Sequence, residues 1–185
     1  MIKKRILIIL SIFIILFGAL LVEKDTINKL IYPKKYSEYV KEYAKEFSLD
    51  ENLVYSVIKA ESKFKQDAVS HKGAKGLMQI SDITRDWAKE ELELGEIDIF
   101  DPGVNIRVGC WYINKLYKEF GELDLVIAAY NGGSGNVKKW LRNNEYSKDG
   151  QKLHSIPFKE TSNYVEKVSK NYEKYNKIYS KEGKN

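Results

Sequence analysis

Apolar residues at helical spacing recur along most of this chain, and no other feature constrains its fold as strongly. Residues 36–47 and residues 53–61 each place apolar side chains along one face of an α-helix. The same spacing returns between residues 104 and 120 and in the long segment that follows Pro157. Residues 123–130 are almost wholly apolar, which indicates a central, buried helix. The sequence therefore predicts a compact, mainly α domain.

Caps and loops divide the predicted helices. Ser48 with Glu51 fits a capping box, and Asp50 is the other possible cap, so either can open the second helix. Residues 65–76 are polar and contain two glycines, so they predict a loop. The short apolar segment 77–80 fits either a strand or the start of a helix.

Further along the chain, residues 83–94 predict a helix with Trp87 turned inward. Asp101 and Pro102 start the next helix, because proline is well suited to a first turn. The glycine-rich run at residues 131–135 predicts a flexible loop before one more short helix.

The N-terminal end of the chain predicts a membrane anchor. Three bases at residues 3–5 precede an uncharged stretch, residues 6–22, rich in Ile, Leu and Phe. This stretch would form a helix about 26 Å long, which is short for a membrane span but long for a signal-peptide core. The bases favour a cytoplasmic N-terminus and place the remainder outside the membrane. A cleaved signal peptide is the alternative, but the small residues Gly18 and Ala19 do not make a convincing cleavage site.

We therefore divide the chain into three parts: residues 1–22 with the bases and the anchor, a polar connector at 23–35, and a folded domain at 36–185 that ends in a long helix. The three N-terminal bases, taken from 31 Lys and Arg in all, leave 28 against 26 Asp and Glu. Such a balance is not typical of nucleic-acid binding. Cys110 is the single cysteine, and the two histidines lack spaced partners, so we expect no metal and no cofactor.

One carboxylate stands on an apolar stripe. Glu61 continues the helical face formed by Leu53, Val54, Val57 and Ile58. Burial disfavours the ionised form of a carboxyl group and raises its pKa, and an acid still protonated near neutral pH is a proton donor. The alternative is a glutamate at a helix end that reaches out to water, and the spacing alone leaves it open.

Short blocks of sequence around Glu61 form a recognisable order. They are Glu61-Ser62-x-Phe64, Gly76-Leu77-Met78-Gln79-Ile80, Asp101-Pro102-x-Val104-Asn105-Ile106, Trp111-Tyr112, Ala129-Tyr130-Asn131-Gly132-Gly133 and Glu160-Thr161-x-x-Tyr164-Val165. Together they resemble the catalytic domain of the family 1 lytic transglycosylases, bacterial cell-wall enzymes with a lysozyme-like fold. The resemblance runs from about residue 40 to about residue 168. The sequence departs from the family pattern at Ser81-Asp82, where Met-Pro is usual, and at Ser162, where Arg is usual.

The resemblance implies a fold and a chemistry. The fold would be a lysozyme-like helical domain with a short irregular or β segment at the cleft. Such enzymes cut the β-1,4 bond between N-acetylmuramic acid and N-acetylglucosamine in peptidoglycan and leave 1,6-anhydromuramic ends. Glu61 matches the catalytic acid and base, and the substrate-binding positions fall on Ser62, Met78, Gln79, Tyr130 and Asn131. We further expect a hydrogen bond from a group such as Tyr130 to help raise the pKa of Glu61.

The partners expected from this interpretation are glycan strands of peptidoglycan and, through the N-terminal helix, the membrane. The localisation would be the bacterial cell membrane, single-pass, with the domain on the extracytoplasmic side. No nucleic-acid partner is expected, and the sequence identifies no protein partner. Two rival functions stay open: a hydrolytic muramidase on the same fold, and a non-catalytic peptidoglycan-binding module.

Overall fold

A computed structural model of the chain describes residues 26–179, and within them the protein is built almost entirely of helices. The named helices are α2 (Ser37–Glu46), α3 (Glu51–Glu61), α4 (Asp82–Glu91), α5 (Pro102–Phe120), α6 (Leu123–Gly132), α7 (Ser134–Leu141) and α8 (Lys159–Tyr179). Isolated antiparallel bridges join Lys75 to Val69 and to Ile80 in the loop between α3 and α4. The predicted mainly α class is confirmed.

Side chains at the helix starts explain where several helices begin. Asp50 caps α3, since its carboxylate accepts a hydrogen bond of 2.7 Å from the backbone amide of Asn52. Of the two caps that the sequence offered, Asp50 is therefore the one used. Ser81 caps α4, and Asp101 caps α5 with Pro102 in the first turn. An oxygen at the cap satisfies a backbone N–H that has no partner inside the helix.

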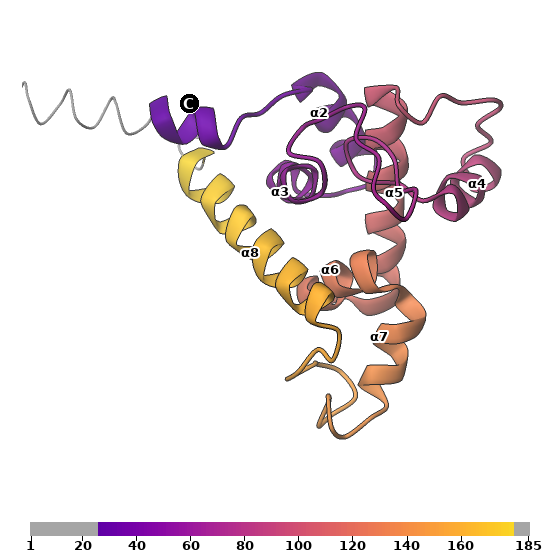
Figure 1. Cartoon of the computed structure of the whole chain (residues 1–185), viewed down its shortest axis with the longest axis vertical. Helices are drawn as coiled ribbons and strands as arrows, with labels where there is room; N and C mark the ends of the chain where they lie inside the picture. The colour runs from indigo at the N-terminus through magenta and orange to yellow at the C-terminus, as the bar shows by residue number, and fades with distance from the viewer. Residues whose placement is uncertain (1–25, 180–185) are drawn as a thin grey trace, which may run out of the picture.

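The helices enclose α3. The long helix α8 packs on α3 and α6, while α5 packs on α2, α4 and α6 (Figure 1). Seven of the eleven residues of α3 are buried, including Tyr55 and Ile58, which have no exposed surface. A helix buried this completely holds its last residue in a fixed place, and that residue is Glu61.

Two local predictions are wrong. Residues 131–135 do not form a flexible loop, because α6 continues to Gly132 and α7 begins at Ser134. Gly133 alone makes the turn, with a φ of 84° that favours glycine. Trp87 is not buried: it is 41% exposed, with one edge of the ring packed on Trp111 at a centroid distance of 4.8 Å, and Ala88 is the residue of α4 that is buried.

The predicted anchor at residues 1–22 lies outside the described residues. Within residues 26–179, no helix is both long and apolar enough to cross a lipid bilayer. The stretch predicted as a polar connector is helical over residues 26–31 and continues into α2 through an irregular segment.

Candidate active site

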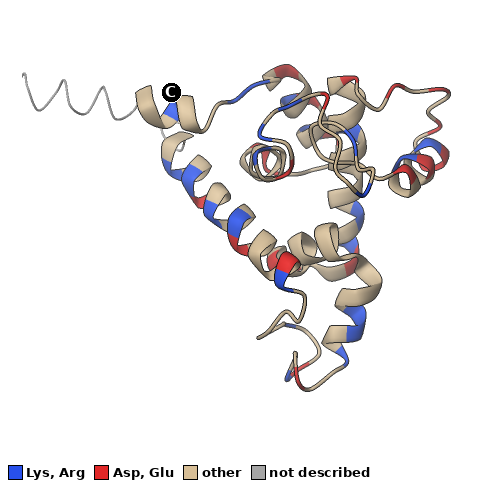
Figure 2. Cartoon of the chain, viewed as in Figure 1, with Lys and Arg blue, Asp and Glu red and all other residues tan. Residues whose placement is uncertain are grey.

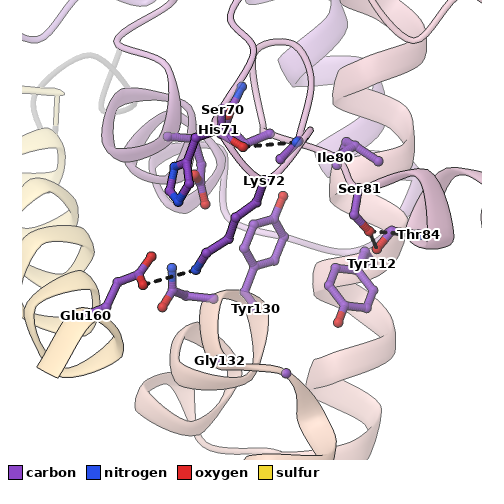
Figure 3. Close-up of a pocket in the computed structure, with 15 residues that line it drawn as sticks. Ser70, His71, Lys72, Ile80, Ser81, Thr84, Tyr112, Tyr130, Gly132 and Glu160 are labelled. Carbon is purple, nitrogen blue, oxygen red and sulfur yellow. Dashed lines mark hydrogen bonds and ion pairs between the residues drawn. The ribbon is translucent and has the colours of Figure 1, made fainter. Parts of the chain in front are cut away.

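A pocket of about 450 Å³ opens where the end of α3 meets the 70–81 loop, α5, the junction of α6 and α7, and the start of α8 (Figure 3). Segments far apart in sequence therefore meet at one place. The lining residues are Glu61, Ser70, His71, Lys72, Ala74, Gln79, Ile80, Ser81, Thr84, Tyr112, Tyr130, Asn131, Gly132, Gly133 and Glu160.

Glu61 is the last residue of α3, and its side chain lines this pocket instead of reaching into open water. The hydroxyl of Tyr164 donates a hydrogen bond of 2.6 Å to Oε1 of Glu61. Burial raises the pKa of Glu61 to about 7, even though the bond from Tyr164 and the charge of Lys167 both favour the ionised form. A carboxyl group with this pKa is protonated in a large fraction of molecules at neutral pH, and it can also accept a proton back.

Tyr130 lines the pocket but does not make the bond that we expected. Its hydroxyl donates to the backbone carbonyl of Met78 at 2.8 Å. The partner of Glu61 is Tyr164, so the predicted donor was wrong. The predicted rise in the pKa of Glu61 through burial is confirmed, but the predicted effect of the hydrogen bond is wrong, because a phenol that donates to a carboxylate stabilises its charged form and lowers its pKa.

Two of the predicted binding residues, Gln79 and Asn131, line the pocket. Gln79 has a positive φ of 51°, and its Nε2 donates to the carbonyls of Ala68 at 3.1 Å and Gly76 at 2.9 Å. Oδ1 of Asn131 accepts a hydrogen bond from Thr161 at 2.9 Å. These bonds fix both side chains. Within residues 26–179, no hydrogen bond engages Oε1 of Gln79 or Nδ2 of Asn131, so one acceptor and one donor are available to a ligand.

The other two predicted binding residues, Ser62 and Met78, have buried side chains that do not line the pocket. Met78 packs on Gly109 of α5, where any Cβ would overlap its sulfur. Its backbone matters more to the site than its side chain: the amide donates to Asn105 and the carbonyl accepts from Tyr130, both at 2.8 Å.

Several lining residues were missed by the sequence reasoning. Lys72 and Glu160 form an ion pair of 3.2 Å that joins the 70–81 loop to the first turn of α8 (Figure 3). Neither Lys72 nor His71 belongs to any sequence pattern. Tyr164 was present in the last matching block, and its position there was the available signal for a role at the site.

Asp82, which departs from the family pattern, brings no second carboxylate into the pocket. It pairs with Lys75 at 2.8 Å and Arg85 at 2.7 Å, and the bond from Lys75 holds the pKa of Asp82 below its usual range. The other acid in the lining is Glu160, already paired with Lys72. In the part of the chain that the structure describes, no three His, Cys, Asp or Glu side chains gather as a metal site would require.

Comparison with known proteins gives matches to lytic transglycosylases, the family that the sequence blocks resemble. The family model described as "Transglycosylase SLT domain" matches residues 38–153. The soluble lytic murein transglycosylase of Escherichia coli K12 is 30% identical over 143 residues, which cover 74% of this chain and 22% of that protein. The membrane-bound lytic murein transglycosylase C of Salmonella arizonae is 33% identical over 125 residues, covering 60% and 34%.

Solved structures agree in three dimensions. The 70-kDa soluble lytic transglycosylase of Escherichia coli superposes with a TM-score of 0.73 at 26% identity, covering 82% of this chain and 25% of that one. An inactive glutamate-to-glutamine mutant of lytic transglycosylase Slt from Pseudomonas aeruginosa gives 0.71 at 28% identity, covering 80% and 25%. The chain thus spans about a quarter of the length of these proteins. The expected lysozyme-like helical fold is confirmed.

Proposed function

Because the chain belongs to the transglycosylase SLT domain family, we propose that it is a peptidoglycan lytic transglycosylase with Glu61 as its general acid and base. The substrate bond is the β-1,4 link between N-acetylmuramic acid and N-acetylglucosamine, and the product carries a 1,6-anhydromuramic end. One observation carries the proposal: Glu61 lines a pocket, is hydrogen-bonded by Tyr164, and has a pKa raised to about 7.

The reaction proceeds in two proton transfers through the same carboxyl group. Protonated Glu61 first gives its proton to the glycosidic oxygen as the bond from that oxygen to C1 breaks. C1 belongs to the N-acetylmuramic acid residue, and the N-acetyl oxygen of this residue supports the positive charge that develops at C1. Ionised Glu61 then takes the proton of the C6 hydroxyl, whose oxygen attacks C1 and closes the anhydro ring. An attacking group within the substrate has a large entropic advantage over water.

The acids of the pocket support this single-carboxylate route. Ordinary glycoside hydrolysis uses two carboxyl groups, one as acid and one as nucleophile or base. Here the second lining acid, Glu160, is 70% exposed and paired with Lys72, and Asp82 is held by Lys75 and Arg85. Both acids are therefore engaged by bases of the domain and do not stand free beside Glu61 as a second catalytic carboxyl group would. This favours the transglycosylase over the hydrolytic muramidase.

The sugar-binding role falls on the pocket side chains that are fixed and still have bonding capacity. Oε1 of Gln79 can accept from an N–H or hydroxyl of the sugar, and Nδ2 of Asn131 can donate to a carbonyl or hydroxyl oxygen. The half-buried ring of Tyr112 offers a flat apolar face in the same lining. A membrane anchor at residues 1–22, with the domain on the extracytoplasmic side, is part of the proposal and rests on the sequence.

Product masses test the proposal. The purified protein is incubated with isolated peptidoglycan, and the released fragments are weighed by mass spectrometry. We expect anhydro ends, each lighter by one water than the hydrolysis product, and we expect Glu61→Gln to release none while retaining glycan binding. Hydrated ends would instead identify a muramidase, and binding without any release by the wild-type protein would identify a non-catalytic module.

A matched control makes the test specific to Glu61. Glu90→Gln makes the same chemical change at an exposed position of α4 and should leave product release unchanged. If Glu61→Gln released fragments at the wild-type rate, the role of Glu61 would be refuted, whether those fragments carried anhydro or hydrated ends.

A further inference from the structure

A second groove, of about 510 Å³, lies between residues 29–35, the end of α3 and α8. Five lysines line it, and no Asp or Glu belongs to its described lining. We call it the lysine groove and define it by Lys29, Lys35, Lys59, Lys63 and Lys167. Figure 2 shows basic residues on the 26–35 stretch and along α8. Among the described residues, the lysine groove shares no lining residue with the Glu61 pocket.

Four of the five lysines in the lysine groove make no ion pair with a described residue. These four lysines, for which residues 26–179 supply no ion pair, are Lys35, Lys59, Lys63 and Lys167. Lys59 and Lys167 donate instead to the backbone carbonyls of Ile31 and Ala60. A carbonyl fixes an ammonium group in place but leaves its charge uncompensated, so the groove retains a concentrated positive field.

The pKa of Lys59 reflects the same clustering of positive charges. Its pKa is lowered, first by burial and then by the positive charges of Lys63 and Lys167. Like charges held close together repel unless an anion lies among them. A negatively charged ligand would relieve this repulsion, and no Asp or Glu belongs to the described lining of the groove.

Exposed aliphatic side chains adjoin the lysine groove. Leu30 is 76% exposed, Ile31 is 51% exposed and Ile27 is 46% exposed, and Leu30 and Ile31 also line the groove. A soluble phosphate polymer would give these side chains no apolar contact. A surface that combines lysines with exposed aliphatic side chains is what binds at the boundary of anionic headgroups and acyl chains.

We propose that the lysine groove, with Ile27, Leu30 and Ile31, docks the domain onto an anionic phospholipid surface. The uncharged stretch at residues 6–22 precedes this face by only a few residues in the sequence, which suits a face that lies against a bilayer. Among the described residues, the proposed docking surface and the Glu61 pocket have separate linings. The inference concerns the orientation of the domain and does not depend on the proposed chemistry.

Lysine footprinting on the full chain tests this docking. The wild-type protein is reconstituted in vesicles of phosphatidylcholine alone or of phosphatidylcholine and phosphatidylglycerol in equal parts, and treated with a membrane-impermeant acetylating reagent. Mass spectrometry then gives the rate at each lysine. In the anionic vesicles we expect Lys35 and Lys63 to react about fivefold more slowly, and high salt to remove this protection. Lys139 and Lys148, which are exposed on and after α7, serve as internal controls and should not change (Figure 1).

A pair of matched variants connects the protection to the charge of the groove. In Lys35→Gln/Lys63→Gln, the protection of Lys167 in anionic vesicles should fall severalfold, whereas in Lys139→Gln/Lys148→Gln it should stay at the wild-type value. Equal rates at Lys35 and Lys63 in the two kinds of vesicle would overturn the proposal. So would protection by soluble polyphosphate in neutral vesicles as strong as that by anionic lipid, which would make the groove a site for soluble phosphate polymers.

Discussion

The hydroxyl of Tyr164 lies 2.6 Å from Oε1 of Glu61 and joins α8 to the end of α3 across 103 positions of the sequence. Two opposing effects meet in this contact. Burial raises the pKa of Glu61, while the hydrogen bond favours its ionised form and lowers it. The balance leaves the pKa at about 7, where one carboxyl group can both give and take a proton.

Tyr164→Phe should shift the pH dependence of the reaction. Loss of the donated hydrogen bond removes stabilisation of the charged form, so the pKa of Glu61 rises further and the alkaline limb of the rate profile moves to higher pH. The rate at the optimum should fall about tenfold, because a hydrogen bond to a charged group contributes about 1.5–3 kcal/mol and orients the carboxyl. The measurement is the rate of release of anhydro ends across the pH range.

Tyr172→Phe is the control for this change. Tyr172 also lies on α8 and donates a hydrogen bond of 3.0 Å to the carboxylate of Asp50, but neither residue lines the pocket. Its loss should leave the pH profile in place. A profile for Tyr164→Phe that coincides with the wild type would show that the contact does not tune Glu61.

Glu61→Gln should make the protein more stable at alkaline pH. The pKa of Glu61 rises from about 4.5 for an exposed glutamate to about 7 on folding, so the folded state holds the proton more tightly. Its contribution to stability is therefore present below about pH 4.5 and is lost as the pH rises to about 7. The loss is about 3 kcal/mol at most.

Denaturant unfolding at low and high pH measures this effect. A neutral glutamine avoids the cost of burying a charge, so the free energy of unfolding of Glu61→Gln should exceed that of the wild type at pH above about 7 and approach it below about 4.5. The exposed Glu90→Gln should show no such difference. Parallel curves for Glu61→Gln and wild type would mean that Glu61 titrates in the folded state as it does in the unfolded chain.

The sequence predicted correctly those features that depend on the residues of a single helix. The stripe ending at Glu61, the cap at Asp101 and the mainly α class depend on residues close together in the chain. The donor to Glu61 could not be chosen by spacing alone, because Tyr130 and Tyr164 both follow helical patterns and only the packing of α8 on α3 decides between them. Gly133 was read as flexible, yet one residue with positive φ suffices to turn between two helices.

Lys72→Ala should ease substrate entry without changing stability. The pair with Glu160 is exposed on both sides and joins two walls of the pocket, so its free energy is at most about 1 kcal/mol. If a glycan must separate Lys72 from Glu160 to enter, the variant no longer bears the cost of breaking this pair. The KM should then fall by no more than about fivefold. Kinetics on soluble glycan fragments give KM, and Lys65→Ala, earlier in the connection between α3 and α4 and outside the pocket lining, should leave it unchanged. A higher KM for Lys72→Ala would instead indicate that Lys72 binds the substrate.

Asn105→Ala should destabilise the domain and the pocket together. Asn105 is fully buried, accepts from the amide of Met78 at 2.8 Å, and donates to the carbonyls of Ile99 at 2.8 Å and Lys75 at 3.1 Å. The amide of Met78 and the carbonyl of Ile99 would lose their buried partner, at a cost of about 3 kcal/mol or more, while the carbonyl of Lys75 would keep its bond from the amide of Ile80. Asn114→Ala removes one half-buried bond, to the carbonyl of Phe47, and should cost about 1 kcal/mol. Equal midpoints for the two variants in thermal unfolding would contradict this account of the loop.

Gly109→Ala tests whether close packing behind the pocket sustains activity. A Cβ on Gly109 would overlap the side chain of Met78, which must then move, and the carbonyl of Met78 holds Tyr130. We expect a loss of about 1–3 kcal/mol in the free energy of unfolding and a lower rate of product release. Gly135→Ala is the matched control, because its Cβ meets nothing within 4 Å and α7 should gain slightly from the better helix former. Since both glycines lie inside helices, a difference in stability between the variants reports the contact with Met78 and not helix propensity.

Equal stability in the two variants would show that the core around Met78 adjusts freely. Contacts other than the carbonyl of Met78 would then hold Tyr130 in position.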